Sequence, residues 1–287
     1  MTIRECVKKG AGILSRSGIT NATEDAKLLA MYTFDLTYQD FLLNIDIEAD
    51  KELADRYVRY IELRSTHYPC QYIIGEQCFM GYPFRVAEEV LIPRPETEIL
   101  VEQALMRSKN RIPCKTLDLC CGSGCIGISY KKKRLEQNID DDDVTLVDIS
   151  REAIALSDDN ANALGVKVNI LRSDLFERVD DRFDMILSNP PYIQTDVIAT
   201  LMEEVRDYEP ILALDGHAYG LYFYDRIIKE ARDHLYDGGM VLFEIGYDQY
   251  EAVRQLFVDA GYGDIELIKD YAGLDRIVTA RWRNNNV

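Results

Sequence analysis

The sequence lacks any long run of apolar residues. No stretch approaches the roughly 20 consecutive apolar residues that a membrane-spanning helix requires. Residues 1–10 carry charges throughout and lack an apolar core followed by a small-residue cleavage site, so we expect no secretory signal. The pattern is typical of a globular protein, and we expect no contact with a membrane.

Histidine is scarce, and the cysteines lack the spacing of a disulfide framework or a zinc site. The cysteines number seven, and four of them crowd one segment: Cys114, Cys120, Cys121 and Cys125. The three histidines lie far from this segment, and adjacent cysteines match no common zinc spacing. We therefore expect no metal, reduced cysteines that pack as small apolar residues, and a cytoplasmic location.

The sequence also lacks an excess of positive charge, since its formal net charge is -17. A protein that neutralises phosphates usually has a basic face. The basic run at residues 131–134 is followed almost at once by the acidic run at residues 140–143. This favours a solvated helix end with mutually compensating charges over a nucleic-acid patch. The acidity therefore argues against a nucleic-acid substrate.

The 287 residues are enough for one large domain and a smaller companion. Residues 1–70 predict a small helical bundle, with Thr2, Thr23 and Asp50 beginning successive helices. Residues 71–90 are aromatic and β-branched with interspersed turn residues, which predicts a connecting β-hairpin. The remaining residues 91–287 form the expected large domain.

The large domain alternates short apolar runs with helical segments. Strands are expected at residues 116–119, 144–147, 167–171, 183–187, 240–243, 265–268 and 276–280. Such alternation requires crossover connections and predicts an α/β fold with a mostly parallel sheet. The last two strands have no helix between them, so they should pair as an antiparallel hairpin.

A glycine-rich loop follows the first of these strands. Gly122, Gly124 and Gly127 have the G-x-G-x-x-G spacing, and Asp148 lies about 20 residues further on at the end of the second strand. Glycines allow the backbone to approach a ligand closely. The motif fits two cofactors, a nicotinamide-adenine dinucleotide and S-adenosylmethionine, because both offer a ribose whose hydroxyls Asp148 could accept.

Three features favour S-adenosylmethionine. Asp118 ends the first strand, where its carboxylate could face the donor's ammonium directly or through water but would repel a pyrophosphate. No obvious proton donor is placed for hydride chemistry, and the next motif follows the fourth strand. Asp174 follows the third strand, where adenine recognition would fall. A turn or a helix cap is the alternative role for Asp148 and Asp174 individually.

The motif Asn189-Pro190-Pro191-Tyr192 follows the fourth strand, at the edge where ligands bind in open α/β sheets. An amide or exocyclic amino nitrogen is a poor nucleophile, and a sulfonium donor already carries the activation. The enzyme must therefore mainly align the displacement. The side-chain oxygen of Asn189 and the carbonyl of Pro190 can each accept one N–H of the target. Tyr192 offers a flat face, although such residues also serve as ordinary turns and core.

Together these residues resemble the peptide chain release factor N5-glutamine methyltransferases, from about Gln71 onward. The resemblance is carried by residues 71–75, 91–98, the glycine loop, 188–193, 208–210 with 213–214, and 238–246. The segment Ile92-Pro-Arg-Pro-Glu-Thr-Glu98 is the specific part. Asn-Pro-Pro-Tyr alone also resembles the adenine N6-methyltransferases of nucleic acid, which stay the alternative enzyme class; a non-catalytic binding module is the third reading.

The resemblance implies a seven-stranded, Rossmann-like S-adenosylmethionine-dependent methyltransferase domain behind a helical domain that recognises the release factor. The substrate would be the glutamine of a Gly-Gly-Gln motif, held by Asn189, Pro190, Pro191 and Tyr192, without direct contact to nucleic acid. The donor would be lined by Cys120, Cys121, Gly122, Ser123, Gly124, Asp148, Asp174, Leu175 and Asn189, with Asp118 nearby.

Two residues depart from the family pattern. Cys120 stands where the family usually has glycine, which requires that this position not need a positive φ, or else costs roughly 1 kcal/mol. Leu175 stands where an aromatic residue is common, so adenine stacking would give way to aliphatic packing. The sequence leaves open whether Arg94 and Glu96 contact the substrate or pair with each other.

Overall fold

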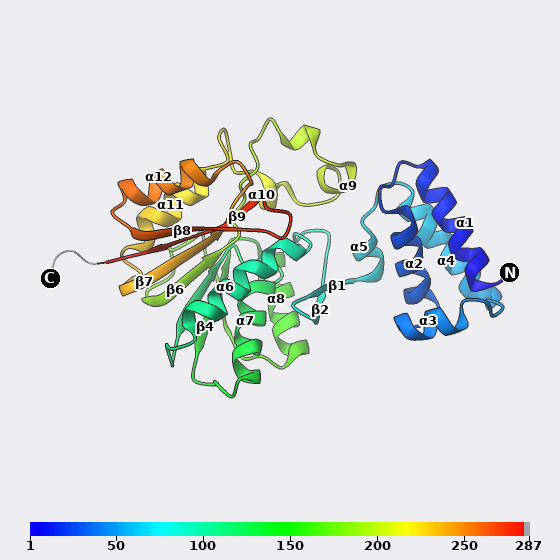
Figure 1. Cartoon of the computed structure of the whole chain (residues 1–287), viewed down its shortest axis with the longest axis horizontal. Helices are drawn as coiled ribbons and strands as arrows, with labels where there is room; N and C mark the ends of the chain where they lie inside the picture. Colours follow the sequence, from blue (N-terminus) through cyan, green and yellow to red (C-terminus); the bar gives the residue numbers. More distant parts are fainter. Residues whose placement is uncertain (284–287) are drawn as a thin grey trace. The chain divides into compact units, whose positions relative to one another are not determined.

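The computed structural model describes residues 1–283, and the chain divides into two compact units (Figure 1). The first, here the helical unit, consists of Met1–Glu76 together with Met202–Tyr208. The second, the α/β unit, contains Gln77–Leu201 and the chain from Glu209 onward. No helix of the described residues is long and apolar enough to cross a membrane.

The helical unit is built on four helices and a fifth short one: α1 (Ile3–Arg16), α2 (Ala22–Thr33), α3 (Tyr38–Asn44), α4 (Lys51–Arg64) and α5 (Cys70–Ile74). Thr2 begins α1 with a reciprocal capping box to Glu5, and Asp50 caps α4, as predicted. α2 begins one residue before the predicted Thr23, and Asn21 at its N-cap makes no side-chain hydrogen bond.

The connecting hairpin is shorter than predicted. Residues 71–74 lie in the helix α5, which follows Pro69 and ends at Gly75 in the left-handed conformation. Their β-branched side chains suggested a strand, but Ile73 and Ile74 pack against the core of the helical unit instead. The hairpin itself consists of β1 (Glu76–Phe79) and β2 (Tyr82–Arg85).

A distant stretch of the chain, residues 202–208, completes the helical unit. It contains the short helix α9 (Glu203–Arg206). The buried guanidinium of Arg64 donates to Asp25 at 2.8 Å and to Glu204 at 2.5 Å. The hydroxyl of Tyr208 donates to the carbonyl of Thr66 at 2.8 Å. The sequence contained no sign of the contacts made by Glu204 and Tyr208, because their partners lie about 140 residues away.

The α/β unit has a seven-stranded sheet in the order β5-β4-β3-β6-β7-β9-β8. The strands are β3 (Lys115–Leu119), β4 (Asp143–Asp148), β5 (Asn169–Arg172), β6 (Phe183–Ser188), β7 (Leu235–Glu244), β8 (Gly263–Lys269) and β9 (Asp275–Arg281). β9 runs antiparallel to both of its neighbours, while the pairs from β5 to β7 are parallel. The predicted α/β class and terminal antiparallel hairpin are confirmed.

Helices cover both faces of this sheet (Figure 1). One face carries α6 (Glu98–Ser108), α7 (Cys125–Glu136) and α8 (Arg151–Leu164), and the other carries α11 (Tyr222–Ala231) and α12 (Tyr250–Asp259). Short helices fill the connections: η1 (Pro95–Thr97), η2 (Ile198–Thr200) and α10 (Ile211–Leu214). Because successive strand residues point to opposite faces, Leu117 and Leu119 join the core on the face that carries α11 and α12, whereas Asp118 points to the face that carries α7.

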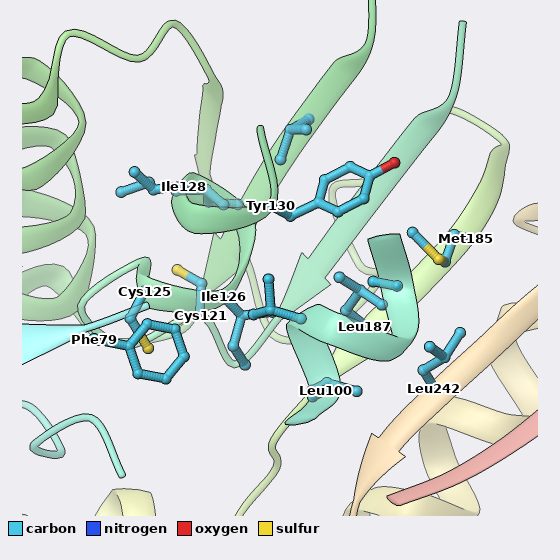
Figure 2. Close-up of a cluster of buried hydrophobic side chains, with 14 of the residues drawn as sticks. Phe79, Leu100, Cys121, Cys125, Ile126, Ile128, Tyr130, Met185, Leu187 and Leu242 are labelled. Carbon is cyan, nitrogen blue, oxygen red and sulfur yellow. The ribbon is translucent and has the colours of Figure 1, made fainter. Parts of the chain in front are cut away.

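The cysteines of the crowded segment act mainly as packing residues. Figure 2 shows Cys121 and Cys125 among apolar side chains that include Phe79 and Ile126. Every cysteine of the chain is free. Within residues 1–283, no group of three or more His, Cys, Asp or Glu side chains is placed to hold a metal ion.

The basic run in α7 differs from its prediction as a solvated helix end. Lys131 is 5% exposed and Arg134 is fully buried. Arg134 pairs with the buried carboxylate of Asp142 and donates to the carbonyls of Ser108 and Arg111. The charges do compensate one another as expected, but they do so inside the protein, where they join α7 to the turn before β4.

Candidate active site

A cavity of about 290 Å³ opens at the carboxyl edge of the parallel strands of the α/β unit. This volume lies near the lower end of the roughly 300–1,000 Å³ that is common for small-molecule sites. Its lining comes from residues 89–94 with Thr97, from the segments after β3, β4, β5 and β6, and from α11. The site thus lies where ligands bind in open α/β sheets.

The loop after β3 is held against Asp148 at the end of β4. The backbone N–H groups of Gly122 and Ser150 each donate to the Asp148 carboxylate at 2.9 Å. Burial raises the pKa of Asp148, and these backbone hydrogen bonds lower it. Cys120, Cys121, Gly122, Ser123 and Asp148 all line the cavity, and their contact with a donor stays a prediction.

Both departures from the family pattern occur at residues with positive φ. Cys120 has φ of 58° and Leu175 has φ of 44°, and both line the cavity. A side chain in the left-handed region costs roughly 1–2 kcal/mol relative to the ordinary conformation. The condition placed on Cys120 from the sequence is therefore not met, and the cavity walls carry local backbone strain at two points.

Asp118 lies outside the cavity lining, behind the loop. Its Oδ2 accepts the backbone N–H of Gly127 at 2.9 Å, while Oδ1 has no hydrogen-bond partner among the described residues. Burial raises the pKa of Asp118 to about 7. Because the N-cap residue Gly124 has no side chain, Asp118 caps α7 from the neighbouring strand. The predicted contact of Asp118 with a donor's ammonium, directly or through water, stays a prediction.

Gly124 also lies outside the lining, and its role is steric. It has φ of 77°, and a Cβ added there would lie 2.6 Å from the side chain of Ile128 and 3.1 Å from Ser157. Glycine is therefore needed at this position for the close approach of α7 to α8 and for the left-handed turn.

Asp174 lines the cavity, but it already has a cationic partner. Arg226 on α11 donates to Asp174 at 2.9 Å and to Glu230 at 3.3 Å. Arg226 lines the cavity together with the aromatic residues Tyr222 and Phe223. These three residues were not predicted from the sequence. Arg226 and Glu230 have the i,i+4 spacing of an ordinary pair on a helix surface, which does not point to a cavity.

The Asn-Pro-Pro-Tyr motif divides between the cavity and the interior. Asn189 and Pro191 line the cavity, and the Asn189 side-chain nitrogen donates to the hydroxyl of Thr97 at 3.3 Å. Pro190 and Tyr192 lie outside the lining. The hydroxyl of Tyr192 lies 3.3 Å from Glu244, and burial raises the pKa of Tyr192. The geometry does not support the predicted flat face of Tyr192 toward a substrate.

A second segment holds the backbone of this motif in place. The side-chain nitrogen of Gln249 donates to the carbonyls of Tyr192 at 2.9 Å and of Gly220 at 3.2 Å. Gly220 has φ of 66°, and a Cβ there would lie 2.2 Å from the Tyr192 carbonyl oxygen. Neither Gln249 nor Gly220 was identified from the sequence, because the residues beside them give no sign of a contact with the distant Asn-Pro-Pro-Tyr motif.

Arg94 pairs with a residue other than the one considered from the sequence. Its guanidinium forms an ion pair with Glu209, whose side chain is buried, whereas Glu96 is exposed. Arg94 also lines the cavity. The pair therefore joins residues 92–98 to residues 208–210, two segments that both carry the family resemblance.

Comparison with known proteins agrees with this geometry. Residues 95–217 match the family model described as "Methyltransferase small domain", and residues 5–75 match the one described as "PrmC N-terminal domain". A solved methyltransferase from Pyrococcus furiosus has a TM-score of 0.52 and 16% sequence identity, covering 80% of this chain and 100% of that chain. At this identity the likeness shows the fold alone.

Sequence relatives extend over nearly the whole chain. The release factor glutamine methyltransferase of Clostridium botulinum is 39% identical over 98% of this chain and 99% of its own length. That of Clostridium acetobutylicum is 37% identical over 98% of each. With the methyltransferase fold and the motif residues at one cavity, the chain belongs to the release factor glutamine methyltransferase family.

Proposed function

We propose that this chain transfers a methyl group from S-adenosylmethionine to the side-chain amide nitrogen N5 of the glutamine in the Gly-Gly-Gln motif of peptide chain release factors. The observation that carries the proposal is that Asn189 lines the same cavity as the glycine loop and Asp148. A group that can hold a planar amide thus lies beside a nucleoside-like site, in a chain of the corresponding family.

The cavity residues fit the donor. The carboxylate of Asp148 is positioned to accept hydroxyls of a ribose, since it lines the cavity and keeps acceptor capacity beyond its two backbone partners. Cys120 to Ser123 would lie along the donor, and Leu175 with Ala153 would offer aliphatic surface to its adenine. When bound, the donor supplies a methyl group that its sulfonium already activates.

The chain's own residues would mainly orient the acceptor. The lone pair of an amide nitrogen is delocalised into the carbonyl, so the nitrogen attacks only when the group is held in line with the methyl carbon. The Asn189 oxygen would accept one N–H, and the Pro190 carbonyl would accept the other. Methylation makes the nitrogen strongly acidic, and its proton then leaves to water, which gives the neutral N-methyl amide.

The helical unit would recognise the release factor. It matches the N-terminal family model over residues 5–75, and it has a hydrophobic core of its own. The substrate would therefore be a folded protein rather than a free amino acid, and the reaction would take place in the cytoplasm.

The test is methyl transfer from labelled S-adenosylmethionine to a recombinant release factor. The controls are the same factor with its motif changed from Gly-Gly-Gln to Gly-Gly-Ala and a double-stranded DNA. Label on the unmodified factor alone would support the donor, the acceptor residue and the substrate together. Label on DNA without label on the factor would replace this proposal by adenine methylation.

A further inference from the structure

Three polar side chains form a chain of hydrogen bonds at the cavity wall, where Thr97 and Asn189 line the cavity and Glu244 lies outside its lining. Glu244 ends β7, Thr97 lies at the start of α6, and Asn189 follows β6. The Thr97 hydroxyl lies 2.6 Å from Glu244 Oε2 and 3.3 Å from the side-chain nitrogen of Asn189. Thr97 and Glu244 are each 2% exposed, so protein groups rather than bulk water determine these contacts.

The chemistry of the three groups fixes the direction of the hydrogen bonds. An ionised carboxylate only accepts, so the Thr97 hydroxyl gives its single proton to Glu244. The oxygen of Thr97 is then left as an acceptor toward Asn189. An asparagine amide presents either NH₂ or oxygen to a neighbour, and only NH₂ satisfies an acceptor. The side-chain oxygen of Asn189 must therefore face away from Thr97.

We propose that Thr97 and Glu244 are positioning residues, which set the amide orientation of Asn189 so that its oxygen is presented to the amide N–H of the substrate. This inference rests on the function proposed above, and adds to it the groups that make Asn189 an acceptor. Without them, the asparagine could turn its NH₂ toward the substrate amide, and two donors would then face each other.

Groups around Glu244 support its role as an acceptor. Its Oε1 lies 3.3 Å from the hydroxyl of Tyr192, which can donate to it. Burial raises the pKa of Glu244 above its ordinary value and the charge of Glu96 adds to the rise, while the hydrogen bonds from Thr97 and Tyr192 and the positive charge of Arg276 oppose it. Two donors and a nearby cation favour the ionised form, in which the carboxylate takes the Thr97 proton.

The first test compares substitutions at Thr97 under the methyl-transfer assay. Thr97→Val keeps the shape but removes the hydroxyl, and should lower kcat about tenfold because the acceptor is no longer pre-oriented. The KM for the release factor and the dissociation constant for S-adenosylmethionine should stay within threefold. Thr97→Ser retains the hydroxyl and should restore kcat to within threefold of the unmodified chain.

The matched control is Thr116→Val. Thr116 is also fully buried and lies on β3, outside the cavity lining, so the substitution likewise removes a buried hydroxyl but leaves the cavity unchanged. Its kcat should remain within twofold. Melting temperatures of Thr97→Val and Thr116→Val would show whether a loss of kcat merely reflects unfolding.

Glu244→Gln is the second variant, and it is useful if Thr97→Val does not fold. With Tyr192 donating to its oxygen, the new amide would direct its NH₂ at Thr97. The Thr97 proton would then point at Asn189 and reverse the amide. The expected result is again about a tenfold fall in kcat with unchanged donor affinity.

The results distinguish a failure of the positioning role of Thr97 and Glu244 from a failure of the proposed methyl transfer. A complete lack of transfer by the unmodified chain would overturn the proposed function and the positioning role together. Transfer by the unmodified chain, with kcat within twofold in both Thr97→Val and Glu244→Gln, would overturn the positioning role alone. An equal loss of kcat in Thr97→Ser would also overturn it, since the hydroxyl would not be the group that matters.

Discussion

The carboxylate of Asp118 accepts the backbone N–H of Gly127 at 2.9 Å, and so caps α7 from a different strand. This capping acid is fully buried, and burial raises its pKa from an ordinary 3.8 to about 7. A raised pKa means that the folded state holds the proton more tightly than the unfolded state. Asp118 therefore favours folding at low pH, and this contribution is lost as the pH rises from about 4 to about 7.

We expect Asp118→Asn to remove this pH dependence. The amide keeps an acceptor for Gly127 but does not ionise, so the variant should gain stability relative to the unmodified chain as pH rises. The raised pKa of Asp118 corresponds to a change of at most about 4 kcal/mol in the free energy of unfolding. Melting temperatures of both proteins at about pH 5 and about pH 8 would check this. If the melting temperatures of the two proteins changed equally with pH, the raised pKa of Asp118 would be contradicted. An unchanged affinity for the donor would agree with the position of Asp118 behind the loop.

Cys120→Gly should stabilise the protein. The residue has φ of 58°, which glycine adopts freely and cysteine does not. After allowance for the greater flexibility of glycine in the unfolded chain, the gain should be about 0.5–1 kcal/mol, or roughly 2 °C in melting temperature. The control is Cys121→Gly, which should destabilise because Cys121 is buried in the core without a positive φ. A lower melting temperature for Cys120→Gly would show that the positive φ of Cys120 does not cost the protein stability.

Gly220→Ala should lower activity at a distance from the reacting atoms. The new Cβ would meet the Tyr192 carbonyl oxygen at 2.2 Å, so the Asn-Pro-Pro-Tyr backbone must move. A displacement of this kind should reduce kcat by at least about tenfold. Gly238→Ala is the matched control, since Gly238 also has positive φ but open space around it. Equal kcat in both variants would show that the loop tolerates the shift.

Asn189→Ala should abolish methyl transfer while largely sparing the binding of S-adenosylmethionine. The substitution removes the acceptor that holds the substrate amide, and loss of one such contact typically costs about 10²–10³ in kcat. Isothermal titration with the donor and single-turnover transfer to the release factor would separate the two effects. Retention of full turnover would remove Asn189 from the reaction.

Arg134→Met should be strongly destabilising. It leaves the buried carboxylate of Asp142 without its cation, which typically costs about 3–5 kcal/mol. The comparison is Arg206→Met, which breaks an exposed pair with Asp207 and should change stability by less than about 1 kcal/mol. Equal urea midpoints for the two variants would contradict the buried pair's importance.

The sequence predicted those parts of the fold that depend on local patterns. Apolar runs located the seven strands, and a Thr2 or Asp50 beside helical periodicity located helix starts. The prediction was wrong at residues 71–74, since β-branched residues form a helical turn there when they can pack against a neighbouring core. It also missed the seven-residue helix α3, which is too short for a clear periodicity.

At the site, motif residues were easier to predict than their supports. Asp148, Asp174 and Asn189 follow strand ends, and parallel topology brings strand ends together. Arg226, Gln249 and Glu209 could not be identified in this way. Each acts through a partner more than 50 residues distant, and only the folded chain brings such pairs together.

The inclusion of residues 202–208 in the helical unit has a consequence for protein engineering. The chain enters that unit at its beginning and again at Met202, so no single cut separates the two units. A shortened protein that starts at Gln77 would retain Glu204 after losing Arg64. A chimera designed to exchange the helical unit between relatives would have to transplant both pieces, the amino-terminal helices and this distant loop.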